Sequence, residues 1–75
     1  MLKANIEIKL NDKGDRWYVE ACSANIDNTD LHPMPSGELF GTKDLAITEM
    51  KRRVMEWFKE KGRMETEDKI EWRVP

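Results

Sequence analysis

A strict alternation of apolar and polar residues marks the start of the chain. From Ala4 to Leu10 every second residue is apolar, and polar residues fill the positions between. This two-residue period is that of a strand with one buried and one solvated face. We therefore predict a strand over residues 4–10, with Ala4, Ile6, Ile8 and Leu10 on its core face.

A second alternating run follows after a short turn. Residues 11–15 are turn formers, and Gly14 among them accepts a positive φ. Residues 16–22 resume the alternation with aromatic and β-branched side chains, which predicts a second strand and hence a hairpin. The core face of this strand is expected to hold Trp17, Val19 and Ala21, and the opposite face Arg16, Tyr18, Glu20 and Cys22.

The alternation stops between Ser23 and Gly37, where Asn, Asp, Pro and Ser are frequent. We predict a long loop here, and loops of this length inside a compact domain are either functional or poorly ordered. Asp27 and Asp30 lie in this segment without close basic neighbours in the sequence, so both are candidate partner-binding residues. Residues 38–40 are predicted to form a short third strand or to lead directly into a helix.

Residues 43–61 are predicted to form the one helix of the chain. Thr42 is a suitable N-cap, Asp44 complements the helix dipole in the first turn, and Gly62 is a natural stop. Pairs of opposite charge are spaced i, i+4 on its surface, namely Glu49 with Arg53 and Arg52 with Glu56. One arc of the helix collects the apolar side chains expected to face the core: Ala46, Ile47, Met50, Val54, Trp57 and Phe58.

A final alternation over residues 69–74 predicts a closing strand, with Ile70, Trp72 and Val74 on its core face. With 75 residues the chain has room for a single domain, residues 1–75. The order ββ(β)αβ predicts an α+β fold, a small antiparallel sheet of three or four strands with one helix of about 20 residues on one face. Because Trp17, Trp57 and Trp72 all fall on predicted core faces, we expect them to form the bulk of the core.

Composition excludes several classes of protein. The 13 basic and 15 acidic residues give a net charge of -2, so the chain is neither a strongly basic nucleic-acid arm nor an acidic tail. One cysteine excludes a disulfide framework within the chain. No apolar stretch approaches the roughly 18 residues of a membrane span, and the polar start is unlike a signal peptide. We expect a cytoplasmic protein.

No catalytic or cofactor motif is present in the sequence. Cys22 and His32 are the only cysteine and histidine, and an irregular segment with no orienting group separates them. The spacing of Cys22, Asp27, Asp30 and His32 matches no zinc or calcium pattern. Glycine-rich phosphate loops and zinc-protease motifs are also absent. We therefore expect a protein that is not an enzyme and that holds neither cofactor nor metal.

A single helix covers only one face of a sheet, so the other face is open to water or to a partner. We expect another protein as the partner, or a second copy of the chain across a sheet face or edge, with Tyr18 as the anchor between Arg16 and Glu20. The helix offers a second candidate surface, because Met55 lies among basic side chains: Lys51, Arg52 and Lys59. This basic flank suits an acidic partner, and in the alternative interpretation it binds nucleic acid.

Two stretches of the chain resemble a known family. Residues 12–19, DKGDRWYV, and residues 35–46, PSGELFGTKDLA, are similar to the N-terminal domain of HicB-like antitoxins. The resemblance implies a βββαβ fold and a partner-binding module, often oligomeric through its sheet, that blocks a small ribonuclease toxin. The leading hypothesis is a small non-enzymatic regulatory domain of a microbe, phage or plasmid, with a nucleic-acid-binding accessory protein or a HicB-like antitoxin module as the alternatives.

Overall fold

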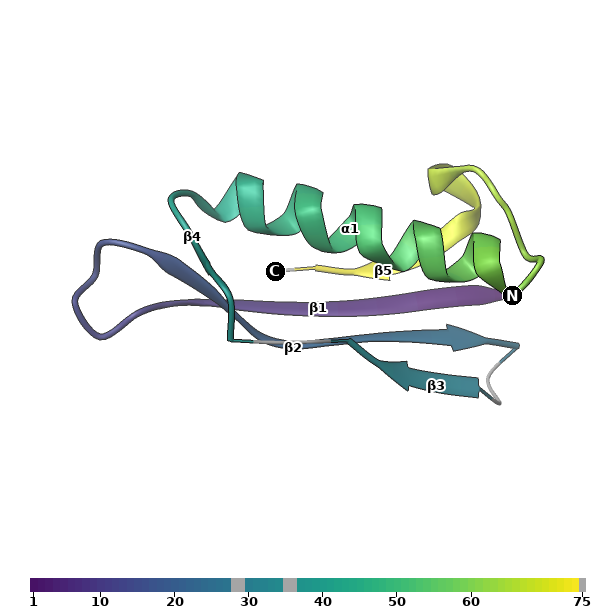
Figure 1. Ribbon diagram of the computed structural model, residues 1–75, viewed down its shortest axis with the longest axis horizontal. Coiled ribbons are helices and arrows are strands. Elements are labelled where there is room, and N and C mark those ends of the chain that lie inside the picture. The colour runs from purple at the N-terminus through teal and green to yellow at the C-terminus, as the bar shows by residue number, and fades with distance from the viewer. Residues whose placement is uncertain (28–29, 35–36, 75) are drawn as a thin grey trace.

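Five strands and one helix form the fold in a computed structural model that describes residues 1–27, 30–34 and 37–74 (Figure 1). The expected turn residues 28–29 and 35–36, and residue 75, lie outside the described residues. In chain order the elements are β1 (Leu2–Leu10), β2 (Trp17–Ile26), β3 (Asp30–Pro33), β4 (Leu39–Phe40), α1 (Lys43–Glu60), the 3-10 turn η1 (Glu67–Lys69) and β5 (Ile70–Arg73).

The sheet has the order β3-β2-β1-β5, and β4 pairs with β2 on the same edge as β3. The predicted α+β class with one helix is confirmed. Two details differ from the expectation. The sheet has five strands where three or four were expected, and β5 runs parallel to β1 in a sheet that was expected to be antiparallel. The helix explains the second difference. It carries the chain back along the sheet, so that the next strand starts at the same end as β1.

The helix lies across one face of the sheet and begins and ends close to the predicted residues (Figure 1). The Thr42 hydroxyl accepts a hydrogen bond of 3.1 Å from the Leu45 N–H, which confirms the N-cap. Gly62 takes a φ of +74°, the left-handed conformation that terminates helices. The predicted core arc is confirmed at its centre, where Ala46, Met50, Val54 and Phe58 are fully buried.

A bulge changes the face assignment in the second strand. The register steps from Ile6 opposite Cys22 to Ile8 opposite Val19, so that β2 has one extra residue between them. The extra residue reverses the inward and outward positions on the two sides of the bulge. Cys22 is therefore buried in the core and Ala21 is only half-buried, the opposite of what uninterrupted alternation predicts.

The predicted long loop is mostly strand. β2 continues four residues past Cys22 to Ile26, and β3 pairs with this extension. The expectation of an irregular segment from Ser23 to Gly37 was wrong because it gave weight to Asn and Ser as turn formers. The buried positions Cys22, Ala24 and Ile26 continue the two-residue period through them.

Several of the expected core residues lie outside the core. Leu10, the last residue of β1, is 48% exposed. The hairpin that follows it extends past the start of the helix (Figure 1). Val74 lies beyond the end of β5 and is also exposed. The three tryptophans are half-buried and pack against the core from outside it. The largest fully buried side chains are instead Phe58, Leu2, Ile6, Met50, Val19 and Val54.

Candidate functional site

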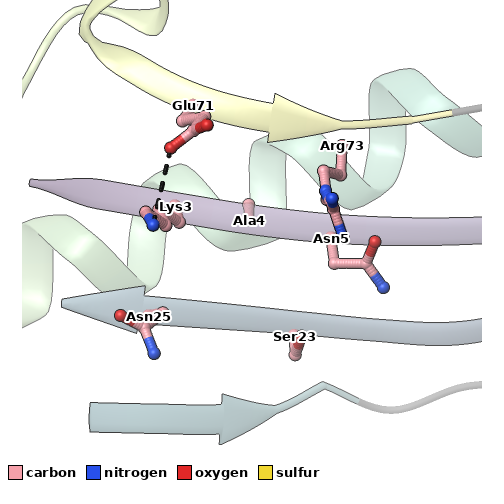
Figure 2. A pocket seen from close by; sticks show the side chains of 7 residues that line it. All are labelled: Lys3, Ala4, Asn5, Ser23, Asn25, Glu71 and Arg73. Carbon is pink, nitrogen blue, oxygen red and sulfur yellow. Dashed lines mark ion pairs between the residues drawn. The ribbon is translucent and has the colours of Figure 1, made fainter. Parts of the chain in front are cut away.

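The face of the sheet opposite the helix carries a hollow of about 390 Å³ (Figure 2). Three adjacent strands form it. β1 contributes Lys3, Ala4 and Asn5, β2 contributes Ser23 and Asn25, and β5 contributes Glu71 and Arg73. The strand register arranges most of these side chains in two rows across the sheet, Asn25 to Lys3 to Glu71 and Ser23 to Asn5 to Arg73.

The two cations of the hollow differ in how they are paired. Lys3 Nζ lies 3.8 Å from a Glu71 carboxylate oxygen, and both side chains are exposed. Arg73 forms no ion pair with any residue that the structure describes, and Figure 2 shows its side chain beside Asn5. A guanidinium without a partner offers up to five N–H donors in a planar fork suited to carboxylates. The hollow therefore has capacity for an acceptor group from another molecule.

Asn25 contributes an unused acceptor to the same hollow. Its Oδ1 atom is buried and has no hydrogen-bond partner among the described residues. A buried amide oxygen without a donor costs free energy, and a donor supplied by water or by a binding partner removes that cost.

Exposed apolar side chains lie on the same open face along the β3 and β4 edge of the sheet, one beside the hollow and one further along β2. Leu31 lies directly opposite Asn25 on the neighbouring strand, and residues opposite each other in a sheet project to the same face. Leu39 lies opposite Tyr18 in the same way. Leu31 and Leu39 are 68% and 52% exposed, and Tyr18 is half-buried. The open face therefore carries both a polar hollow and exposed apolar side chains.

The remaining candidates on the hairpin and in the acidic segment have mixed placements. Glu20 is exposed and forms an ion pair of 2.8 Å with Lys9, and Arg16 is exposed at the base of the hairpin turn. Asp27 binds the Arg63 guanidinium through both carboxylate oxygens and also contacts the amino group of Met1. The Arg63 hydrogen bonds hold the pKa of Asp27 well below its usual range. The side chain of Asp30 lies outside the described residues.

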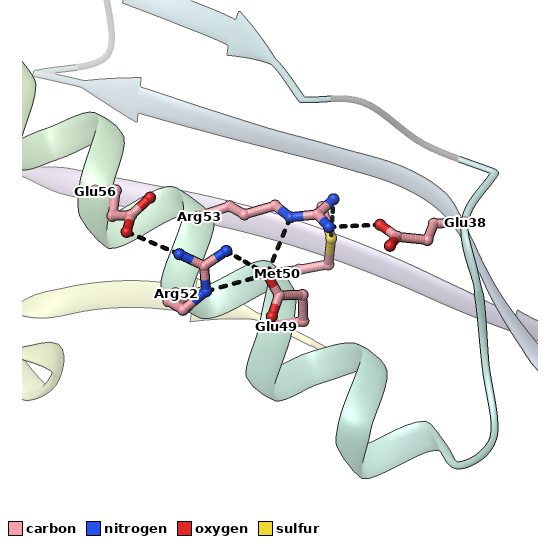
Figure 3. A network of polar contacts seen from close by, with 6 residues as sticks. All are labelled: Glu38, Glu49, Met50, Arg52, Arg53 and Glu56. Atoms are coloured by element: carbon pink, nitrogen blue, oxygen red, sulfur yellow. Dashed lines mark hydrogen bonds and ion pairs between the residues drawn. The ribbon is translucent and has the colours of Figure 1, made fainter.

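The basic flank of the helix is largely paired within the chain. Lys51 Nζ lies 3.5 Å from a Glu67 oxygen and 5.1 Å from the centre of the Trp72 ring. Arg52 bridges Glu49 and Glu56, which includes the expected i, i+4 pair (Figure 3). Met55 is half-buried and packs against the core. Lys59 is exposed.

Arg53 joins the helix to the edge of the sheet, a contact that the sequence pattern does not show (Figure 3). Its guanidinium lies 2.6 Å from a Glu38 oxygen just before β4, and 3.2 Å from Glu49 in the expected helical pair. The contact to Glu38 spans 15 residues, so no local spacing rule predicts it. It ties the segment that leads into β4 to the helix.

Cys22 and His32 are not on the open face. Burial raises the pKa of the Cys22 thiol to about 11, so the thiol stays protonated near neutral pH and is a poor nucleophile. The His32 ring stacks on Trp57 of the helix at 4.8 Å between ring centres. Both side chains therefore serve packing between the sheet and the helix.

Sequence reasoning missed several residues of the hollow: Lys3, Ser23, Asn25 and Ala4. A signal for two of them exists, because Ser23 and Asn25 alternate with the buried Cys22, Ala24 and Ile26.

The described residues contain no cluster of three or more His, Cys, Asp or Glu side chains that could hold a metal ion. In residues 1–27, 30–34 and 37–74, no helix has the length and apolar character needed to cross a membrane.

Comparison of the chain with models of known families, with characterised proteins and with solved structures finds no match.

Proposed function

We propose that this protein is a small non-enzymatic, regulatory domain that binds another protein through the open face of its sheet. The observation that carries the proposal is the hollow lined by Lys3, Asn5, Ser23, Asn25 and Arg73, with the exposed Leu31 opposite Asn25 on the neighbouring strand. Arg73, which forms no ion pair with the described residues, gains hydrogen bonds when acceptor groups of a partner surface cover it.

The exposed apolar side chains of the open face support a protein partner in particular. Protein interfaces combine aromatic and apolar anchors with a polar surround, and Leu31 beside the hollow and Leu39 and Tyr18 further along β2 supply such anchors on the same face. Burial of an exposed leucine contributes roughly 1.5–3 kcal/mol to association before the entropy of binding is subtracted.

Nucleic-acid binding through the helix receives less support. Lys51 and Arg52 already lie beside carboxylates of the same chain, so their positive charge is largely compensated. Phosphate-driven binding depends on uncompensated cations that displace counterions. A salt-dependent gel shift that is lost in the double variant Lys51→Glu, Arg52→Glu would overturn the assignment to protein binding.

The proposal is tested by blocking the hollow. Ser23→Arg places a long charged side chain in the lining of the hollow. Lys59→Glu changes an exposed residue of the helix, which lies on the other side of the sheet. A partner identified by mass spectrometry after affinity capture should bind the Lys59→Glu variant like the wild type and the Ser23→Arg variant at least tenfold more weakly by calorimetry. Loss of binding in the helix variant alone contradicts the proposal. Circular dichroism confirms that both variants fold.

The resemblance to HicB-like antitoxins supports a narrower version in which the partner is a small ribonuclease. Its test is the rate of RNA cleavage by the captured partner. Cleavage that falls when wild-type protein is added, and that recovers with the Ser23→Arg variant, supports inhibition through the hollow. A partner without ribonuclease activity contradicts this narrower version and leaves the protein-binding proposal standing.

A further inference from the structure

The strand β5 ends the sheet, and its outer edge has no neighbouring strand among the described residues. It pairs with β1 on one side only, over Leu2 to Asn5. Half of the backbone N–H and C=O groups of such an edge strand point away from the sheet, and they are a template for a further strand. Residues 70–73 contain neither a proline nor a bulge, which are two of the features that block strand addition at an edge.

The sequence of β5 is complementary to itself when two copies run antiparallel. With a two-fold axis at Trp72, Glu71 of each copy lies opposite Arg73 of the other, and the two tryptophans lie opposite each other. Ile70 then lies opposite Val74. Every cross-strand pair in this register joins opposite charges, two aromatic rings or two apolar side chains, which are the favourable pairings in a sheet.

The two faces of β5 are consistent with this register. Glu71 and Arg73 line the hollow on the open face, so their cross-strand pairs would form there. Trp72 and Ile70 lie on the helix side, where Ile70 is buried and Trp72 is only half-buried. Trp72 donates a hydrogen bond of 3.0 Å to the Glu67 carbonyl and lies under Lys51, which leaves part of its ring uncovered. A second Trp72 and an exposed Val74 would cover apolar surface at this edge.

Arg73 gives a further reason for a second copy. It has no ion-pair partner in the part of the chain that the structure describes, whereas Glu71 has only the exposed contact of 3.8 Å with Lys3. The two-fold register supplies both residues with a partner of opposite charge at the same time.

The opposite edge of the sheet does not offer the same arrangement. β3 contains Pro33, which has no N–H to donate and commonly blocks strand addition. β4 is only two residues long. Neither strand contains a pair of opposite charges that a two-fold axis would bring together.

We infer that two copies of this chain associate through β5, antiparallel about Trp72, and so form one continuous sheet. The dimer would place the two open faces on the same side of that sheet. The inference goes beyond the proposed function and does not depend on it, because the purified chain needs no other partner to dimerise.

The charges of β5 provide the test. Sedimentation equilibrium of the wild type should give a concentration-dependent dimer with twice the 8.9 kDa mass of the chain. Arg73→Glu replaces each of the two Glu71–Arg73 pairs across the axis with a pair of glutamates. This repulsion should raise the dimer dissociation constant by about tenfold or more. The double variant Glu71→Arg, Arg73→Glu restores opposite charges across the axis and should dimerise like the wild type.

A mixing experiment separates the edge from other surfaces. Chains with Arg73→Glu alone and chains with Glu71→Arg alone should each be largely monomeric, but an equimolar mixture should form a heterodimer, detected by native mass spectrometry. A wild type that stays monomeric overturns the inference. A dimer unaffected by Arg73→Glu, or a mixture that stays monomeric, assigns the association to another surface and equally overturns it. Thermal melting of each variant confirms that the monomer is folded.

Discussion

Phe58 lies at the centre of the core, on the helix face that packs against β1 and β2, and is fully buried. Truncation to alanine removes its contacts and leaves a cavity. We expect Phe58→Ala to lower the free energy of unfolding by about 3–5 kcal/mol, measured by urea denaturation. Leu45→Ala on the same helix is the matched control, because Leu45 is 58% exposed. Equal losses in the two variants would contradict this placement of the core.

Asp27 connects the end of β2 to the segment after the helix through its two hydrogen bonds to Arg63. Its φ is +52°, a conformation that asparagine adopts as readily, so Asp27→Asn removes charge without straining the backbone. Because Arg63 lowers the pKa of Asp27 in the folded state, the ion pair stabilises the fold fully above the ordinary aspartate pKa of about 3.9. That contribution is lost as the pH falls towards the lower folded pKa.

The melting temperature of Asp27→Asn should therefore lie below that of the wild type at neutral pH, and the two should converge as the pH falls below about 4. Thermal melts followed by circular dichroism across this range measure the difference. Asp12→Asn is the control, because Asp12 is an exposed turn carboxylate without an ion pair among the described residues. A constant difference at every pH would show that charge is not the cause.

At the scale of the element, the bulge in β2 determines which of two neighbouring residues is buried. Cys22 is in the core and Ala21 is half-buried. A serine hydroxyl buried without a partner costs about 1–3 kcal/mol. Urea denaturation should therefore show a loss of this size for Cys22→Ser and a much smaller loss for Ala21→Ser. The reverse order would mean that β2 alternates without a bulge.

The hairpin between β1 and β2 shows how much one polar residue organises locally. The side-chain oxygen of Asn11 accepts hydrogen bonds from the backbone N–H groups of Asp15 and Arg16. The side-chain nitrogen of Asn11 donates a hydrogen bond of 2.9 Å to the Asp15 carboxylate. The position of this turn could be predicted from composition. The choice of Asn11 over the neighbouring polar residues could not, because it depends on the backbone path through Gly14.

At the scale of the whole molecule, the sheet has a protected centre and thinner edges. β1 pairs on both sides over its first four residues and lies under the helix, whereas β3 and β5 pair on one side only. Local opening needs fewer broken contacts at an edge. Amide hydrogen exchange should therefore be slowest in Leu2–Asn5 and faster in Asp30–Pro33. Equal exchange rates in the two segments would contradict this ordering of local stability.

The sequence by itself determined the features that depend on neighbours a few residues apart. The helix from Lys43, its Thr42 cap, its Gly62 stop, its buried arc and the hairpin follow from capping chemistry and from periods of 3.6 and 2. These interactions form within one turn or one strand, so the order of residues suffices to predict them.

The tertiary structure alone decided the features that join distant parts of the chain. The bulge placed Cys22, and not Ala21, in the core. The helix made β5 parallel to β1, and residues from three strands came together in the hollow. The contacts of Arg53 with Glu38 and of Arg63 with Asp27 also cross between elements. Each of them depends on how elements pack, which is set by the summed burial of the whole core and not by any local pattern.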